Sequence, residues 1–149
     1  MRRITLYGAG ILLFGIDRLL KIFSRNFSAD HQVFGDVLVF THVENSGIAW
    51  GIPFSGTWAL IASSIALIIV MALLAASFQK KQILIEAGWM LIWLGAFSNF
   101  LDRILDGVVT DFLQPLAGPA MNIADIMIAV GAAIAIGGYL AHSRRQLKA

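Results

Sequence analysis

The sequence predicts an all-α membrane protein with four transmembrane helices and a small β-rich element between the first two. Two observations carry this prediction. Of the 149 residues, 58% are hydrophobic and only 13% are charged, and the mean hydropathy is +0.80. Soluble domains carry about 25% charged residues, so a chain of this composition is expected in a bilayer. We expect one membrane-embedded domain over residues 1–149.

Four stretches are long enough to be transmembrane helices, because a span needs about 20 predominantly apolar residues to cross roughly 30 Å of hydrocarbon. They lie at about 4–23, 58–78, 83–105 and 119–141. The second contains no charged residue. The first and third contain ionisable residues, which we expect to face a protein interior.

The first stretch also resembles a secretory signal peptide, because Arg2 and Arg3 precede a mostly apolar run. Asp17, Arg18 and Lys21 then stand where a cleavage site of small residues would be expected. We therefore expect a first helix that is retained.

The basic residues predict the orientation. Most fall at the N-terminus, in the loop at 78–83 and at the C-terminus, which four spans place on one side of the membrane: Arg2, Arg3, Lys80, Lys81, Arg144, Arg145 and Lys148. By the positive-inside rule this side is cytoplasmic. The acidic residues other than Glu86 lie toward the opposite face, so we expect extracytoplasmic chemistry.

The segment between the first two spans is not apolar enough to cross a membrane. Residues 37–43 are rich in β-branched side chains and predict a small sheet at the interface. Asn45-Ser46-Gly47 follows as a turn. Elsewhere, small residues predict close helix packing: Gly88, Gly95, Ala96, Gly131 and Ala135.

Two polar groups are expected on single helical faces. Asp17 and Lys21 are one turn apart, and they form either a structural ion pair or a support for a nearby site. Asn99, Asp102 and Arg103 are spaced i, i+3, i+4. They form either a satisfied network or a site in which the arginine holds a carboxylate or phosphate.

Two further carboxylates lie near the same membrane face. Asn122 and Asp125 are at the start of the fourth span, where helix amides favour an anion. Simple capping by Asp125 is not expected, because it lies beyond the first residues of the apolar run. Asp111 follows Gly107 in a short re-entry toward the membrane, and its alternative is a turn carboxylate.

The loop between Asp111 and Asp125 can bring these two carboxylates together. It contains Pro115, Gly118 and Pro119. At about 4 Å and an effective dielectric near 20, their repulsion would be about 4 kcal/mol. This would split their pKa values by about three units. One group would stay protonated beside an ionised one, as an aspartic protease requires.

The sequence also bears on other functional classes. The chain has no cysteine, so thiolate chemistry is excluded, and its basic residues do not form a nucleic-acid-binding stripe. Intramembrane Asp and Arg also mark ion pathways, so a small proton- or cation-coupled carrier is the alternative. A third interpretation is a metal-dependent phosphotransferase built on Asp102, Asp111 and Asp125.

Five ordered motifs give a specific resemblance. They are Asp17 with Lys21, Asn45-Ser46-Gly47-Ile48-Ala49-Trp50, Gly95-Ala96-Phe97-Ser98-Asn99-Phe100-Leu101-Asp102-Arg103, Gly107-Val108-Val109-Thr110-Asp111-Phe112 and Asn122-Ile123-Ala124-Asp125. In this order and register the chain resembles lipoprotein signal peptidase, the bacterial signal peptidase II. It departs from the usual family pattern at Ser98, Ile48 and Trp50, and the link from Asp111 to Asp125 is a few residues short.

The resemblance implies a four-helix fold with a small extracytoplasmic β-rich cradle between helices 1 and 2. It implies an intramembrane aspartic endopeptidase with Asp111 and Asp125 as catalytic residues. Such an enzyme cuts a prolipoprotein before its diacylglyceryl-modified cysteine. The substrate-binding or supporting residues it implies are Asp17, Lys21, Asn45, Gly47, Asn99, Asp102, Arg103 and Asn122.

The same resemblance implies the cellular location, the topology and the partners of the protein. We expect a multi-pass protein of the bacterial cytoplasmic (inner) membrane, with both termini cytoplasmic and its active site near the extracytoplasmic face. The expected partners are prolipoprotein substrates and membrane lipids, with no nucleic acid. We expect a monomer that uses no cofactor and no metal.

Overall fold

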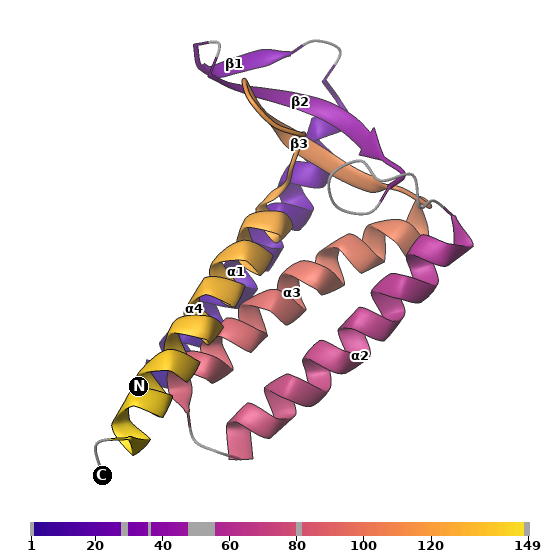
Figure 1. The fold of residues 1–149 in the computed structure, drawn as a ribbon. Helices are drawn as coiled ribbons and strands as arrows, with labels where there is room; N and C mark the ends of the chain where they lie inside the picture. Colours follow the sequence, from indigo (N-terminus) through magenta and orange to yellow (C-terminus); the bar gives the residue numbers. More distant parts are fainter. Residues whose placement is uncertain (1, 28–29, 36, 48–55, 80–81, 148–149) are drawn as a thin grey trace.

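Four long helices carry a small sheet at one end (Figure 1). The computed structural model describes residues 2–27, 30–35, 37–47, 56–79 and 82–147, so Ile48 and Trp50 lie outside the described residues. The elements in chain order are α1 (Arg2–Ser24), β1 (His31–Phe34), β2 (Leu38–Asn45), α2 (Thr57–Gln79), α3 (Ile83–Leu105), β3 (Val109–Pro115) and α4 (Ile123–Gln146).

Three of the predicted spans are confirmed as helices long and apolar enough to cross a membrane, within the described part of the chain. They are α2, α3 and residues Ile123–Arg144 of α4. The second and third spans match their predicted bounds to within one residue. Their apolar runs are bounded by polar residues, which makes their ends easy to locate.

The start predicted for the fourth span was wrong by four residues, because α4 begins at Ile123. Just before it, Met121 forms an isolated bridge with Leu113 of β3. The amide of Met121 donates to the carbonyl of Leu113 at 2.8 Å, and the amide of Leu113 donates to the carbonyl of Met121 at 2.9 Å. The chain at Met121 therefore runs extended beside β3 before it turns into the helix.

The first predicted span, 4–23, also forms a helix, α1, of 23 residues. It is not among the three helices that pass the length and hydropathy criteria for a span in the described chain. Its charged residues explain this, since Arg3, Asp17, Arg18 and Lys21 all fall within it. A membrane crossing by α1 stays a prediction.

The sheet is antiparallel in the order β1-β2-β3. The strand predicted at 37–43 is confirmed by β2. The prediction that the β-rich element lies only between the first two helices was incomplete, because β3 comes from the segment between α3 and α4. Phe112 of β3 is fully buried, and its ring centroid lies 5.4 Å from that of Phe40 on β2. This contact fixes β3 against β2.

Small residues let α3 and α4 pack closely, as predicted. A Cβ at Gly88 would lie 2.6 Å from the carbonyl oxygen of Gly131. A Cβ at Gly95 would overlap the carbonyl oxygen of Ala124. The second contact matters for the site, because Ala124 lies in the first turn of α4 beside Asp125.

Candidate active site

Asp111 lies on β3 and is almost completely buried, with 1% of its surface exposed. It is paired in register with Val43 of β2. Two side-chain amides donate to its carboxylate: Nδ2 of Asn45 lies 3.0 Å from Oδ2, and Nδ2 of Asn122 lies 2.7 Å from Oδ1. The alternative of a turn carboxylate does not fit a residue inside a strand with these two partners.

Asp125 lies in the first turn of α4, and it does cap that helix, contrary to the prediction. The amide of Asn122 donates to Oδ2 of Asp125 at 3.1 Å, and the amide of Asp125 donates to Oδ1 of Asn122 at 2.9 Å. This reciprocal arrangement is a capping box formed by Asn and Asp. It was missed because the start of the helix was placed too early.

Asn99 of α3 connects the two carboxylates to the rest of the site. Its Nδ2 donates to Oδ1 of Asp125 at 2.9 Å. Its Oδ1 accepts from Nδ2 of Asn122 at 3.1 Å and from Nζ of Lys21 at 2.8 Å. The predicted residues Asn99 and Asn122 therefore meet between Asp111 and Asp125.

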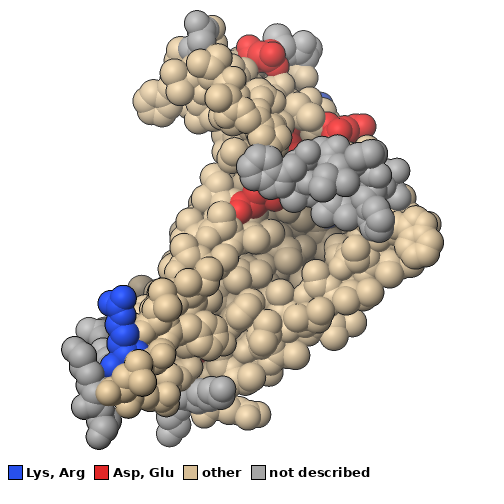
Figure 2. Space-filling view, viewed as in Figure 1, with Lys and Arg blue, Asp and Glu red and all other residues tan. Residues whose placement is uncertain are grey.

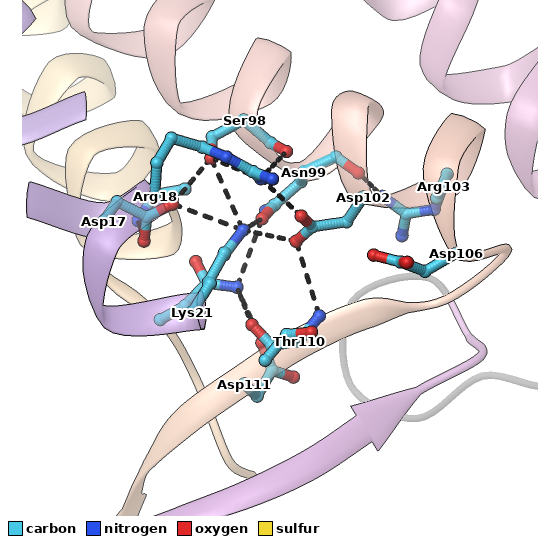
Figure 3. A network of polar contacts seen from close by, with 12 residues as sticks. Asp17, Arg18, Lys21, Ser98, Asn99, Asp102, Arg103, Asp106, Thr110 and Asp111 are labelled. Atoms are coloured by element: carbon cyan, nitrogen blue, oxygen red, sulfur yellow. Dashed lines mark hydrogen bonds and ion pairs between the residues drawn. The ribbon is translucent and has the colours of Figure 1, made fainter. Parts of the chain in front are cut away.

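A buried ionic cluster lies behind the amides (Figure 3). Nζ of Lys21 lies 2.7 Å from Oδ2 of Asp102 and 3.2 Å from Oδ2 of Asp17. All three side chains are fully buried. The structure thus joins the two predicted helical-face groups into one cluster between α1 and α3.

Asp17 also reaches the start of α4. Its Oδ1 accepts a hydrogen bond of 3.0 Å from the amide of Ala124. Its Oδ2 accepts one of 2.6 Å from the hydroxyl of Ser98. Ser98, noted only as a departure from the family pattern, therefore contributes a donor to the cluster.

Arg18 is a second residue that sequence reasoning missed. Its Nη1 forms an ion pair with Oδ1 of Asp102 and donates to the carbonyl of Ser98 at 3.1 Å. Its partners are 80 or more positions away in the chain, so no local spacing could have indicated them. The backbone amide of Thr110 completes the surroundings of Asp102 at 3.4 Å.

Arg103 bonds to the backbone in this structure. Its Nη2 donates to the carbonyl of Gly47 at 3.0 Å, and its Nη1 donates to the carbonyl of Asn99 at 3.3 Å. The amide of Gly47 in turn donates to Oδ1 of Asn45 at 3.0 Å. Arg103 thus ties the turn after β2, predicted at Asn45-Ser46-Gly47, to α3.

The environment of Asp111 raises its pKa from 3.8 to about 6. Burial is the largest cause, and the charge of Asp125 adds to it. Hydrogen bonds from Asn45 and Asn122 and the charge of Lys21 act in the opposite direction. A carboxyl group in this range can exchange a proton near neutral pH.

The cluster does not match the metal interpretation. Both oxygens of Asp102 are engaged by Lys21 and Arg18, and cations in these positions oppose a metal ion. In the parts of the chain that the structure describes, no group of three or more His, Cys, Asp and Glu side chains is placed to hold a metal.

Comparisons with known proteins show the family of the chain. A family model described as signal peptidase (SPase) II matches residues 9–141. The lipoprotein signal peptidase of Lactococcus lactis subsp. cremoris (strain SK11) is 35% identical over 102 residues, 67% of this chain and 67% of that protein. The lipoprotein signal peptidase of Clostridioides difficile (strain 630) is 33% identical over 126 residues, 81% of this chain and 84% of that protein.

Solved structures are similar over nearly the whole chain. One, described as a bacterial membrane enzyme solved by the in meso method at 2.3 Å resolution, has a TM-score of 0.80 at 26% identity and covers 95% of this chain and 89% of its own. Another with the same description at 1.9 Å resolution has a TM-score of 0.75 at 28% identity, covering 93% and 92%. The curated relatives are peptidases, which favours the peptidase prediction over the carrier alternative. The chain belongs to the signal peptidase II, or lipoprotein signal peptidase, family of membrane hydrolases, which remove signal peptides from prolipoproteins.

Proposed function

We propose that the chain is an aspartic endopeptidase that uses Asp111 and Asp125 to cut a prolipoprotein before its diacylglyceryl-modified cysteine. One observation carries the proposal: Asn122 binds both carboxylates, Asp111 through its side chain and Asp125 through its backbone amide. Within the described residues, the hydrogen bonds given to these two carboxylates all come from amide groups. Two neighbouring carboxylates with neutral partners are suited to share one proton.

The two environments suggest the role of each group. Asp125 lies in the first turn of α4, where the helix dipole favours a negative charge. We assign it as the base that takes a proton from the attacking water. Asp111, whose pKa is raised to about 6, is then the acid that donates its proton to the carbonyl oxygen of the scissile bond.

With these roles the reaction balances. Water oxygen bonds to the carbonyl carbon as its proton moves to Asp125, and the carbonyl oxygen takes the proton of Asp111. Collapse of this tetrahedral intermediate breaks the carbon–nitrogen bond, and the leaving amine takes the proton from Asp125. The hydroxyl proton of the intermediate returns to Asp111, which restores the starting state.

We propose that the other predicted residues hold this pair in place. Asn45, Asn99 and Asn122 donate to the carboxylates. Arg103 and Gly47 hold the turn that carries Asn45. The remaining predicted residues, Asp17, Lys21 and Asp102, support the site from behind.

We propose further that α1 is a fourth span and that the site faces the extracytoplasmic side of the bacterial cytoplasmic membrane. In support, the visible acidic residues lie at the sheet end, and the visible Lys and Arg gather mainly at the opposite end (Figure 2). The same view shows a hollowed surface between α2 and α4 that leads toward the sheet end (Figure 2). This surface would receive the apolar signal peptide from the bilayer.

The test compares Asp111→Asn and Asp125→Asn with the parent protein in cells that lack their own enzyme. Cleavage of a diacylglyceryl-modified precursor is followed by gel shift. Each variant should lose about a thousandfold in activity, which is within the range for general acid or base catalysis. Asp106→Asn is the matched control, because Asp106 is only partly buried and pairs with Arg25 outside this cluster. Normal processing by either dyad variant would overturn the proposal.

A further inference from the structure

The three amides around the carboxylates all point the same way, and in each case an obligate donor fixes the direction. The Oδ1 of Asn45 accepts from the amide of Gly47, and the Oδ1 of Asn122 accepts from the amide of Asp125. The Oδ1 of Asn99 accepts from the ammonium of Lys21. A backbone amide or an ammonium can only donate, so each side chain must turn its own NH₂ group toward a carboxylate.

Lys21 is the only one of these three orienting donors that is a side chain, and it is the only charged one. Its three protons face four acceptors, on Asp102 at 2.7 Å, Asn99 at 2.8 Å, Asp17 at 3.2 Å and Ser98 at 3.5 Å, and the bond to Asn99 is the second shortest. Asn122 also donates to Asn99, but its NH₂ group has two protons for three acceptors, with Asp111 the nearest. Lys21 holds the amide of Asn99 more firmly than Asn122 does, because its bond to Oδ1 is charged and shorter, 2.8 Å against 3.1 Å.

We infer that Lys21 is a positioning residue for catalysis: it acts through Asn99, whose NH₂ group it directs onto Asp125, and so it keeps that carboxylate ready to accept a proton. This inference rests on the proposed function. Lys21 itself is fully buried, so it acts without touching the substrate. A charge-assisted bond to the oxygen of Asn99 also strengthens the hydrogen bond that its nitrogen donates.

The effect of removing Lys21 can be distinguished from a collapse of the cluster, because its neighbours have other hydrogen-bond partners. Without Lys21, Asp17 keeps the hydroxyl of Ser98 and the amide of Ala124. Asp102 keeps Arg18 and the amide of Thr110. Asn99 loses its charged donor and keeps only the bond of 3.1 Å from the side chain of Asn122. A defect in orientation is therefore expected from Lys21→Met beyond any loss of stability.

The charged groups near Asp111 and Asp125 influence their pKa values and therefore the pH profile of the reaction. From α1 they are Asp17 and Lys21, with Arg18 bound to Asp102. From α3 they are Asp102 and Arg103, and Arg103 interacts electrostatically with both Asp111 and Asp125. Lys21 lowers the pKa of Asp111 through its charge. Its removal should therefore shift the pH profile in the alkaline direction.

The experiment measures kcat and KM against pH for the full-length protein in lipid bicelles, with a synthetic diacylglyceryl-modified precursor peptide as substrate. Lys21→Met should lower kcat by about tenfold to a hundredfold with KM nearly unchanged. Its profile should move upward by about one pH unit. Arg18→Met is the matched control, since it removes a cation from Asp102 but does not contact Asn99. It should reduce thermal stability without moving the pH profile.

A double-mutant cycle tests whether Lys21 acts through Asn99. In the Asn99→Leu background, Lys21→Met should cause little further loss of kcat. Equal losses in both backgrounds, or an unshifted profile in Lys21→Met, would overturn the inference. If Lys21→Met is inactive or does not fold, Asn99→Leu with Lys21 intact must itself lower kcat with KM nearly unchanged, and a normal kcat there would also overturn the inference.

Asp125→Asn is assayed in the same series to separate two kinds of failure. Activity in that variant would overturn the proposed function. An inactive Asp125→Asn together with an unshifted Lys21→Met would remove only the role of Lys21.

Discussion

Charged side chains are buried at both ends of α3, and the two places are built differently. At the sheet end, Asp102 bonds to Lys21, Arg18 and the amide of Thr110. At the other end, Glu86 is also fully buried, but its Oε2 bonds to Arg3 at 2.9 Å and its Oε1 has no partner within the described residues. Arg3 itself is 42% exposed.

The cluster around Asp102 is built to position groups precisely, whereas the pair of Arg3 with Glu86 only attaches α1 to α3. A buried ion pair gains little net stability, because desolvation offsets most of the attraction. A single half-satisfied pair such as Arg3 with Glu86 is sufficient to hold α1 against α3. A network in which each carboxylate has several donors fixes geometry far more tightly. Such precision is expected where two carboxylates must hold one proton between them.

The largest contrast is expected between Asp17→Asn and Glu86→Gln. Asp17 accepts from Lys21, Ser98 and Ala124, so an NH₂ group there would face a donor. Breaking such a buried cluster costs about 3–5 kcal/mol, and we expect activity to fall at least about a hundredfold. Glu86→Gln should change the free energy of unfolding by about 1 kcal/mol or less and leave activity unchanged.

Both variants are measured by thermal unfolding in bicelles and by precursor cleavage. Equal losses of activity in the two variants would mean that the buried charges at both ends of α3 matter equally for the reaction.

The second largest effect is expected in how the free energy of unfolding depends on pH. The pKa of Asp111 is raised to about 6, so between pH 4 and pH 6 the folded protein binds more protons at this group than the unfolded chain does. The free energy of unfolding therefore falls as pH rises through this window, by at most about 3 kcal/mol. Asp111→Asn does not titrate, so its stability relative to the parent should increase from pH 4 to pH 7.

Unfolding midpoints of the parent, Asp111→Asn and the control Asp106→Asn at several pH values test this expectation. A difference between Asp111→Asn and the parent that stays constant over this range would contradict the raised pKa. Sites that carry out chemistry often reduce stability in this way.

The elements that could be predicted are those whose signal is local. The second span carries no charged residue and the third is mostly apolar between Gln82 and Asp106, and the ends of both were located within one residue. The third strand was missed because it ends in Pro115 and pairs with β2 from more than 60 positions away in the chain. The start of α4 was misplaced because the residues before Ile123 look apolar enough for a span, whereas Met121 pairs with Leu113 of that strand.

The residues of the site could also be predicted only where their signal is local in the sequence. Spacing on a helix identified Asp17 with Lys21, but it could not indicate that Lys21 reaches Asn99, 78 positions away. Local spacing also gave no reason to assign Ser98 a role. The structure shows that its hydroxyl fills a place between Asp17 and the two cations of α1. Tertiary packing created these contacts, and no periodicity in the sequence encodes them.

Substitutions that disturb the close packing of α3 on α4 should have effects of intermediate size. Gly95→Ala and Gly88→Ala both place a Cβ against the backbone of α4, and overpacking of this kind costs about 1–3 kcal/mol. Gly95 faces Ala124, next to Asp125, whereas Gly88 faces Gly131 and Ala135 farther along α4. Both variants should unfold at lower temperature, but only Gly95→Ala should lose activity, by about tenfold. An equal loss of activity in Gly88→Ala would show that general helix packing, not the first turn of α4, limits the reaction.

The smallest effect is expected at the pair of Arg25 with Asp106, which joins the ends of α1 and α3 just outside the buried cluster. Its side chains are 41% and 31% exposed, and such pairs contribute about 0–1 kcal/mol because water and salt screen them. Arg25→Met should therefore lower the unfolding midpoint only slightly, and the effect should vanish in about 1 M salt. Arg18→Met, whose partner Asp102 is fully buried, should keep its full effect in the same salt. If both variants responded equally to salt, the cluster behind the amides would be as accessible to solvent as the surface pair, and it could not hold the amides of the site in one orientation.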